Sequence, residues 1–434
     1  MGILASATVK SVKDFSLSDK KYSLPALLAT LSASFIGGGF SAGNAAKTVQ
    51  YGIGNIIALF GFSVSVILVG TFIVPRIKRL SGCVSVGDIM GSTYGSGAKL
   101  CTGVFSFLVC AGILGAQVGS MGYMFRILLG TSQLMGIIIG CSVIIVYSTF
   151  GGMKAVVASD ILQVIVLGIG VPLLLFFSLK HTGGFDAVAH ALPPEYFNPL
   201  NGTSLLGFIS LFLSLALGEA LVPPFVQRLM MGNSIKTTRR ATILSGVLSV
   251  PFFIITGAVG LVGAVYFAGQ SINPESVMPL MVSRVAPTGF RGLIIAAMLA
   301  VLMSSSDSYL NSASVALVND VIVPLTKNKT GHSSRLTAVY ITSLLTGVFA
   351  IITAIMIPNV LDVLTFAYSF WSPVILVPLA AALMGIKKRP AAFYTSAFSG
   401  LLSMLLWKFA FGSPFGIDGT VIGVIVNFAV FIMF

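Results

Sequence analysis

Charged residues are scarce in this chain. Only 9% of its 434 residues are Asp, Glu, Lys or Arg, whereas 56% are hydrophobic. Ordinary soluble domains carry about 25% charged residues, and the mean hydropathy of this chain is +1.01. The shortage of charge therefore excludes a soluble domain of any size. It indicates an all-α polytopic protein that crosses a membrane many times.

Cysteine and histidine are also rare, with four and three residues respectively. Cys83, Cys101, Cys110 and Cys141 show no CxxC pair and no metal-ligand spacing, so we interpret them as small apolar residues. The scarcity of histidine argues against a buried imidazole-based metal or catalytic centre. The serines of the apolar segments also lack a nearby His or Lys that could act as a base. We therefore expect no enzyme and no cofactor.

Long apolar runs make up most of the chain. A polar, basic lead at 1–23 precedes about twelve of them, and it does not resemble a signal peptide. We expect a ten-helix core at 24–385 and two additional transmembrane helices at 386–434. The predicted spans are 24–45, 51–75, 100–130, 134–150, 155–179, 204–231, 241–268, 291–322, 335–357, 360–385, 391–411 and 414–434.

Basic residues are unevenly distributed between the two sides of these spans. If the lead lies inside, 19 of the 25 Lys and Arg residues fall on the inside, including Arg228 at the inner end of the sixth span, and Lys47 is one of the six in outside loops. This asymmetry predicts a cytoplasmic N-terminus, and we expect a multi-pass protein of the plasma (inner) membrane. The net charge of +13 is then an orientation signal and needs no nucleic-acid partner. The oligomeric state is left open.

Helix-breaking residues interrupt two spans. The first span contains FIGGGFSAGN at 35–44, and the sixth contains ALGEALVPPF at 216–225. The two interruptions are five spans apart, so the spans run in opposite directions, as expected for inverted repeats at 24–180 and 204–385. Paired broken helices commonly mark the binding site of a transporter. Gly and Pro also occur in membrane helices for packing alone, which is the alternative interpretation.

The eighth span has a polar face. At about 100° per residue, seven polar side chains lie on one half of the helix, and they cannot face lipid. Their oxygens suit a hard cation such as Na⁺, although serines can also simply join neighbouring helices. These side chains belong to Ser304, Ser305, Asp307, Ser308, Asn311, Ser312 and Ser314.

Other polar residues in the spans allow two interpretations each. Asp160 is either a helix-start charge or part of a site. Glu219 either pairs with Arg228, nine residues away, or faces a cavity. Tyr368 either packs in the core or lines a pocket, and Asp362 is expected to cap a helix.

Four segments together resemble a known family. ASFIGGGF, FGGMKAVVASDILQ, PPFVQRLMMG and MSSSDSYLNSASVALVND occur in this order and resemble the sodium/solute symporter family, which has the LeuT-type inverted-repeat fold. The resemblance covers nearly the whole chain. It implies Na⁺ bound by two serine hydroxyls and by backbone carbonyls of the first and eighth helices, with an acid nearby and a second ion site. The residues so assigned are Ser304, Ser305, Val301, Leu28, Leu31, Asp160 and Ser308.

The segments GGGF, VQR and SSSDS are most similar to the branch that contains the high-affinity choline transporters. That branch carries Trp where this chain has Phe35 and again around Val222. A quaternary ammonium group favours an aromatic cage, so choline itself is not expected. Family members also usually have one more helix before the lead. Either this chain is truncated or this member does without that helix.

We therefore expect a sodium-coupled symporter that imports a small organic solute by alternating access, with the solute bound between the two broken helices. Glu219 is the only carboxylate between these walls, which favours a cationic or zwitterionic solute. The alternative is a transporter-like sensor that binds solute without moving it. The predicted solute-binding residues are Phe35, Gly37, Gly38, Gly39, Gly218, Glu219, Val222, Gln117 and Tyr368.

Overall fold

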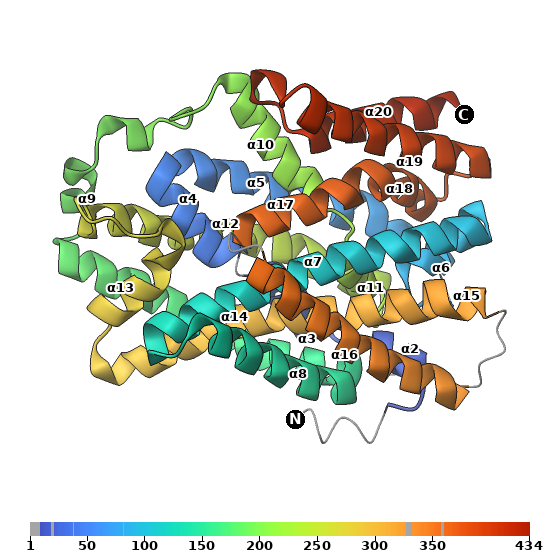
Figure 1. The fold of residues 1–434 in the computed structure, drawn as a ribbon, viewed down its shortest axis with the longest axis horizontal. Coiled ribbons are helices and arrows are strands. Elements are labelled where there is room, and N and C mark those ends of the chain that lie inside the picture. Colours follow the sequence, from blue (N-terminus) through green and yellow to red (C-terminus); the bar gives the residue numbers. More distant parts are fainter. Residues whose placement is uncertain (1–8, 19–20, 38, 81, 327–331, 357–359) are drawn as a thin grey trace.

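The computed structural model describes residues 9–18, 21–37, 39–80, 82–326, 332–356 and 360–434. Within these ranges the chain is helical and forms no strand, apart from an isolated bridge between Tyr22 and Gly232. Most long helices run lengthwise through the molecule (Figure 1). The predicted all-α architecture is therefore confirmed.

The α-helices in chain order are α2 (Val12–Leu17), α3 (Leu24–Phe35), α4 (Asn44–Tyr51), α5 (Ile53–Leu68), α6 (Val86–Tyr94), α7 (Ser96–Leu129), α8 (Gln133–Thr182), α9 (Phe185–Ala191), α10 (Leu205–Gly218), α11 (Pro223–Leu229), α12 (Ile235–Tyr266), α13 (Val277–Val285), α14 (Thr288–Val315), α15 (Val323–Leu325), α16 (His332–Met356), α17 (Val360–Trp371), α18 (Val377–Met384), α19 (Pro390–Leu405) and α20 (Gly419–Met433). Five π-helical segments continue or join them: η1 (Gly39–Gly43), η2 (Val69–Ile73), η6 (Ala316–Ile322), η7 (Ser372–Leu376) and η8 (Leu406–Ala410).

Several of these helices are long and apolar enough to cross a membrane. Seven helices among the described residues meet that condition, or nine if each of two bent helix pairs counts as one span. One of the seven, α8, has 50 residues. A straight helix of that length would extend about 75 Å, far more than a hydrocarbon core of about 30 Å. The predicted total of about twelve spans stays a prediction.

A break at Gly152 divides α8 into two helices. Gly152 has φ 53° and ψ −160°, outside the helical region, and it lies between the predicted spans 134–150 and 155–179. Residues that carry a side chain rarely adopt this backbone conformation. The helix α2 packs closely against the break. A Cβ added to Gly152 would lie only 3.1 Å from Cα of Phe15 in α2. The polar lead therefore contains a short helix whose buried Phe15 and Leu17 were not anticipated as core residues.

The two predicted interruptions are present as bends. The axes of Leu24–Ser34 and Gly39–Tyr51 differ by 62°, and those of α10 and α11 differ by 55°. The first broken helix is longer than predicted, since α4 continues to Tyr51 and ends at Gly52, which has φ 67°. Sequence reasoning ended the span at 45 because α4 is polar, but α4 contacts α12 and α5.

Side chains of α17 and η7 bind the backbone that the second break exposes. The hydroxyl of Ser372 donates to the carbonyls of Leu217 (2.8 Å) and Gly218 (3.1 Å). The indole Nε1 of Trp371 donates to the carbonyl of Ala220 at 3.3 Å. Carbonyls freed by a broken helix are costly at membrane depth unless protein groups bind them. These contacts therefore stabilise the break.

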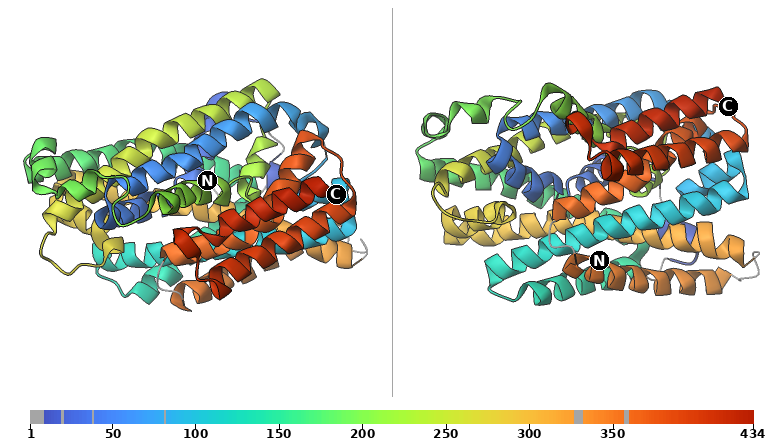
Figure 2. Two further views of the ribbon diagram at one scale, coloured as in Figure 1. Left: turned by 90° about the horizontal axis from the view of Figure 1, so that it is seen from above. Right: turned by 45° about the horizontal axis from the view of Figure 1, so that its top comes forward.

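The last two helices lie side by side at one edge of the molecule (Figures 1 and 2). They pack on η7, where Nδ2 of Asn427 in α20 donates to the carbonyl of Pro373 at 2.7 Å. This arrangement is compatible with two helices added to a core that ends at 385. The division of that core into two repeats stays a prediction.

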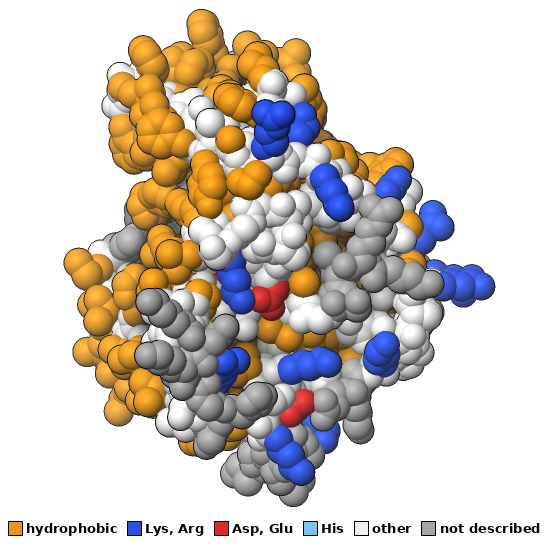
Figure 3. Space-filling view, turned by 90° about the vertical axis from the view of Figure 1, so that its right-hand side faces the viewer, with side chains coloured by type: hydrophobic (Ala, Val, Ile, Leu, Met, Phe, Trp, Pro, Cys, Tyr) orange, Lys and Arg blue, Asp and Glu red, His pale blue; other side chains and the backbone are white. Residues whose placement is uncertain are grey.

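Lys and Arg side chains gather on the end of the molecule that carries α6, α15 and the α18–α19 connection (Figure 3). The connection itself contains Lys387, Lys388 and Arg389. This end corresponds to the side that the charge asymmetry assigns to the cytoplasm. The orientation in the membrane stays a prediction.

We predict that Gly152→Ala lowers the free energy of unfolding by about 1–3 kcal/mol, the usual cost of a residue held in a sparsely populated backbone region. The measurement is the midpoint of thermal unfolding in detergent. Gly168→Ala is the matched control in the same helix, because nothing lies within 4 Å of a Cβ there. Equal midpoints for the two variants would contradict the assigned backbone break.

Candidate functional site

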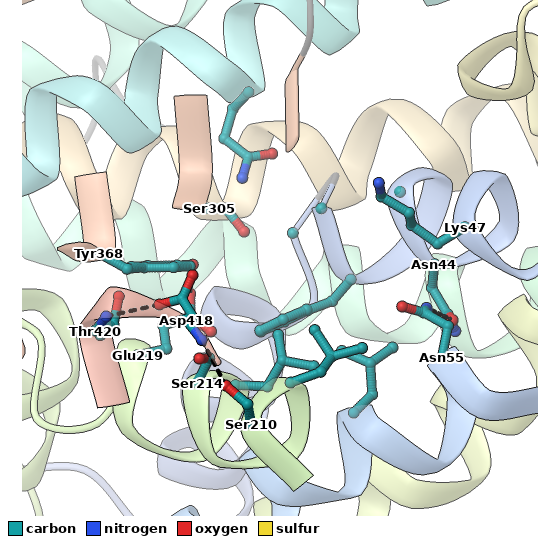
Figure 4. Close-up of a pocket in the computed structure, with 18 of the residues that line it drawn as sticks. Asn44, Lys47, Asn55, Ser210, Ser214, Glu219, Ser305, Tyr368, Asp418 and Thr420 are labelled. Carbon is teal, nitrogen blue, oxygen red and sulfur yellow. Dashed lines mark hydrogen bonds between the residues drawn. The ribbon is translucent and has the colours of Figure 1, made fainter. Parts of the chain in front are cut away.

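A cavity of about 370 Å³ lies between the two broken helices (Figure 4). Its wall includes η1 and α4 on one side, α10 and Glu219 on another, and parts of α7, α14 and α17. Residues of α5, the start of α20 and the loop before α20 also line the cavity. The lining residues are Ser34, Gly37, Gly39, Phe40, Gly43, Asn44, Lys47, Asn55, Leu59, Gln117, Gly207, Ser210, Leu211, Ser214, Leu215, Glu219, Ser305, Tyr309, Tyr368, Ser413, Gly416, Asp418 and Thr420.

Most of the predicted solute-binding residues lie at this cavity. Those that line it are Gly37, Gly39, Gln117, Glu219 and Tyr368. Gly218 lies just behind the wall, where a Cβ would be 3.4 Å from the ring of Tyr368. Val222 is buried at the start of α11 and does not line the cavity. Gly38 and the side chain of Phe35 lie outside the described residues, as does the side chain of Asp362.

Glu219 is buried beside the cavity with one oxygen bound and one without a partner. The hydroxyls of Tyr309 and Tyr368 both donate to Oε1 at 2.9 Å. Across the described part of the chain, Oε2 has no hydrogen-bond partner. The alternative that Glu219 pairs with Arg228 is wrong, because Arg228 pairs with Asp160.

The absence of a side chain on Gly37 allows the first break to approach α7 and α14. A Cβ on Gly37 would lie 2.8 Å from both Nε2 of Gln117 and Oγ of Ser305. A carbon at that distance would require Nε2 of Gln117, Oγ of Ser305 or the backbone of the first break to move. Gly37 therefore brings a bent backbone, an amide and a hydroxyl together at one wall of the cavity.

Sequence reasoning missed several polar residues of the cavity. Lys47 appeared as a basic residue in an outside loop, but α4 places it in the wall. Asp418 and Thr420 come from the start of the last helix, for which no pattern indicated a role. Asp418 caps α20, because its Oδ1 accepts from the backbone N–H of Thr420 at 2.7 Å. A longer first span would have revealed Lys47, whereas only the packing of α20 on α10 reveals Asp418.

The serine pair of α14 contacts backbone carbonyls of the first helix, at one wall of the cavity. The hydroxyl of Ser304 lies 2.9 Å from the carbonyl of Ala33 and 3.0 Å from that of Val301. The hydroxyl of Ser305 lies 3.1 Å from the carbonyl of Ser34. An all-oxygen set of hydroxyls and carbonyls suits a hard cation.

The predicted ligands from the first helix were Leu28 and Leu31. The serine hydroxyls instead contact the carbonyls of Ala33 and Ser34, which follow these residues in the same helix. The side chain of Leu31 is buried in the core and that of Leu28 is half-buried. A role for their carbonyls as ligands stays a prediction.

Asp160 forms a buried ion pair that the sequence did not indicate. Its Oδ2 lies 3.2 Å from Nη2 of Arg228, and both side chains are fully buried. Arg228 also donates from Nε to Thr30 (2.9 Å) and from Nη2 to Ser308 (2.6 Å). Arg228 is therefore a central residue and not part of the basic inner surface. A buried carboxylate that pairs with Arg is more than a helix-start charge.

The polar face of α14 is buried among other helices, as expected. Asp307 accepts a hydrogen bond from Tyr147 at 2.7 Å and one from Ser308 at 3.1 Å. Ser312 donates to Oε1 of Gln227 at 2.6 Å, and Nδ2 of Asn311 donates to the carbonyl of Phe15 at 2.9 Å. For this lower half of the face, the alternative of serines and amides that join helices describes the contacts well.

The four cysteines are free thiols. Cys83 lies in the connection between α5 and α6, outside the apolar spans. Burial, followed by the negative charge of Asp88, raises the pKa of its thiol to about 11. A thiol with that pKa stays protonated at neutral pH and is a poor nucleophile. This result agrees with the interpretation of Cys83 as a structural residue.

Known proteins similar to this chain are membrane transporters. The model of the family described as "Sodium:solute symporter family" matches residues 21–400. The chain is 30% identical over 274 residues to the high-affinity proline transporter of Bacillus subtilis (strain 168). The matched region covers 58% of this chain and 55% of that protein. It is 23% identical over 393 residues to the high-affinity choline transporter 1 of Drosophila melanogaster, where the matched region covers 83% of this chain and 60% of that protein.

The chain thus spans between half and two thirds of the length of these two relatives. Among solved structures, a Na⁺-coupled sialic acid symporter in a substrate-bound outward-open state has a TM-score of 0.86 at 20% identity, with 100% of this chain and 94% of that chain covered. At this identity the likeness shows the fold alone, and it confirms the predicted LeuT-type architecture. The matched family and relatives are transporters, which fits the expectation that the chain is not an enzyme.

We predict that Asp160→Asn and Arg228→Gln each lower the free energy of unfolding by about 3–5 kcal/mol, because each leaves an uncompensated charge in a buried site. The loss of unfolding free energy in the double variant should be clearly smaller than the sum of the losses in the two single variants. The measurement is a double-mutant cycle on thermal or denaturant unfolding in detergent. Additive losses would show that the two side chains do not interact.

Proposed function

Because the chain belongs to the sodium:solute symporter family, we propose that it is a Na⁺-coupled secondary active transporter that imports a small organic solute. The observation that carries this proposal is the position of Ser305. Its hydroxyl contacts the carbonyl of Ser34 in the first broken helix, and both residues also line the cavity. The proposed ion site and the proposed solute site therefore share two residues.

In the proposed mechanism, Na⁺ binds between α14 and α3. Its ligands would be the hydroxyls of Ser304 and Ser305 and backbone carbonyls, including that of Val301. A cation held by both helices stabilises the conformation in which they are in contact. The solute would bind next to this ion, between the two breaks, and rocking of one part of the bundle against the other would expose it to the opposite side.

The membrane potential can drive this transport. Each Na⁺ that enters down about 100 mV releases about 2.3 kcal/mol, and about 1.4 kcal/mol corresponds to a tenfold ratio. One Na⁺ for each solute molecule would therefore support roughly fifty-fold accumulation from the potential alone. The inward driving force on Na⁺ sets the direction of import, and the predicted cytoplasmic N-terminus and plasma-membrane location are part of the same proposal.

Asp160 and Ser308 remain proposed contributors to ion binding. Arg228 contacts both of them, so any second ion near these residues would share them with the guanidinium group. Oδ1 of Asp160 has no hydrogen-bond partner among the described residues. It is the acceptor that such an ion would approach, since Oδ2 is held by Arg228 and Thr30.

We predict that the double variant Ser304→Ala/Ser305→Ala loses Na⁺-dependent thermal stabilisation and Na⁺-driven uptake. Both proposed side-chain ligands are removed, and the apparent Na⁺ affinity should fall at least about tenfold. Ser306→Ala is the matched control, because Ser306 donates to the carbonyl of Leu302 within α14. Stabilisation is measured in NaCl against KCl, so the solute need not be known.

Uptake is measured in proteoliposomes with an inward Na⁺ gradient. Labelled proline and choline are the first probes, because the matched relatives are named for them. Unchanged Na⁺ dependence in the double variant would overturn the site. Solute binding without flux under any gradient would instead indicate the alternative, a sensor.

A further inference from the structure

We propose that the cavity selects a zwitterionic solute whose positive group binds Glu219 and whose negative group lies toward Lys47. This inference deepens the proposed function and rests on it. It uses the charges of the cavity wall and none of the Na⁺ ligands. Both side chains line the cavity, and they lie on opposite sides of it in Figure 4.

Glu219 has one oxygen without a hydrogen-bond partner among the described residues. The two tyrosine hydroxyls fix Oε1, so the orientation of the carboxylate is set before a solute arrives. Only 5% of Glu219 is exposed, and Oε2 has no partner in the described part of the chain. A buried carboxylate oxygen without a donor is unfavourable. An ammonium or other cationic donor from the solute would supply a charge-assisted hydrogen bond.

No cationic side chain competes for this oxygen within the described ranges. Lys99 pairs with Asp88 and Asp320, and Arg228 pairs with Asp160. Arg228 is the basic residue nearest to Glu219 in the sequence, and its guanidinium is bound to other groups. Among the described residues, no basic side chain supplies a positive partner for Glu219, which leaves this role to the solute.

Lys47 provides the opposite charge. Its ammonium lies 5.5 Å from the centre of the Tyr51 ring and forms no ion pair among the described residues. The side chain is half-buried, so its charge is only partly screened by solvent. An anionic group of a solute in the cavity would interact favourably with this ammonium. A purely cationic solute would leave the ammonium of Lys47 without an anionic partner.

Asp418 reinforces the difference between the two sides. In the view of Figure 4 it lies on the same side of the cavity as Glu219, away from Lys47. Its Oδ1 is committed to capping α20, but the carboxylate still adds negative potential to that side. A simple monocarboxylate would leave Glu219 unpaired and approach two like charges. A neutral polyol would leave both Glu219 and Lys47 without a charged partner.

The probes that test this inference are the linear ω-amino acids from glycine to 6-aminohexanoate, each with its methyl ester and its N-acetyl derivative. The ester lacks the negative charge and the N-acetyl derivative lacks the positive charge. Dissociation constants are measured by thermal shift at saturating Na⁺. For at least one chain length, the wild-type protein should bind the zwitterion about tenfold more tightly than either derivative.

The two variants should each lose one kind of discrimination. Glu219→Gln should bind the zwitterion and the N-acetyl derivative within about threefold of each other and still reject the ester. Lys47→Gln should bind the zwitterion and the ester equally and still reject the N-acetyl derivative. Glu195→Gln and Lys180→Gln are matched controls, because both residues are exposed and lie outside the cavity. They should behave as the wild-type protein does.

Stabilisation by Na⁺ alone separates failure of this inference from failure of the proposed function. A variant that retains it is folded and has an intact ion site. If Na⁺ stabilises the wild-type protein but no zwitterion of the series binds, or if the N-acetyl or ester derivative binds as tightly, the inference is overturned and the symporter proposal stands. Full discrimination in Glu219→Gln would likewise overturn it.

Discussion

Polar groups buried inside an apolar bundle must be bound by other protein groups, and α14 carries an unusual number of them. Ser304 to Val315 of this helix are all buried. Its hydroxyls and carboxylate reach α3 through Ala33 and Ser34, α8 through Tyr147, and α11 through Gln227 and Arg228. Each of these contacts fixes a neighbouring helix relative to α14. The arrangement of the two broken helices depends on them.

The three carboxylates near the centre of the molecule differ in how they are bound. Asp160 has the guanidinium of Arg228, and Asp307 has the hydroxyls of Tyr147 and Ser308. Glu219 has two tyrosine hydroxyls on Oε1 and, among the described residues, no partner on Oε2, and Oδ1 of Asp160 likewise has none there. The first two are bound by several protein groups within the packed helices. The third faces the cavity, which is the reason to assign it to the solute and not to the scaffold.

The breaks themselves are stabilised by groups distant in the sequence. Ser372 and Trp371 bind the carbonyls exposed at the end of α10, although they lie about 150 residues away. Irregular backbone at membrane depth persists only where protein or a cavity accommodates it. The second break has both, since α17 contacts its backbone and Glu219 within it lines the cavity.

The sequence by itself determined the class of the protein, the approximate positions of most apolar helices and the two interruptions. These features depend on local composition: apolar runs of membrane length and clusters of Gly and Pro. It also determined that one face of α14 must be buried, because helical periodicity places its polar residues together. The serine pair was found in this way, and its family pattern then suggested a role.

Only the tertiary structure decided which polar groups meet. The sequence suggested that Arg228 could pair with Glu219, nine residues away, but its partner is Asp160, 68 residues away. It likewise placed Lys47 in a loop and gave no role to Asp418, because both join the cavity only when α4 and α20 pack on other helices. Spacing along one helix specifies a face, and the neighbour opposite that face is set by packing between helices from distant parts of the chain. Pairing of charges across helices therefore cannot be read from local pattern.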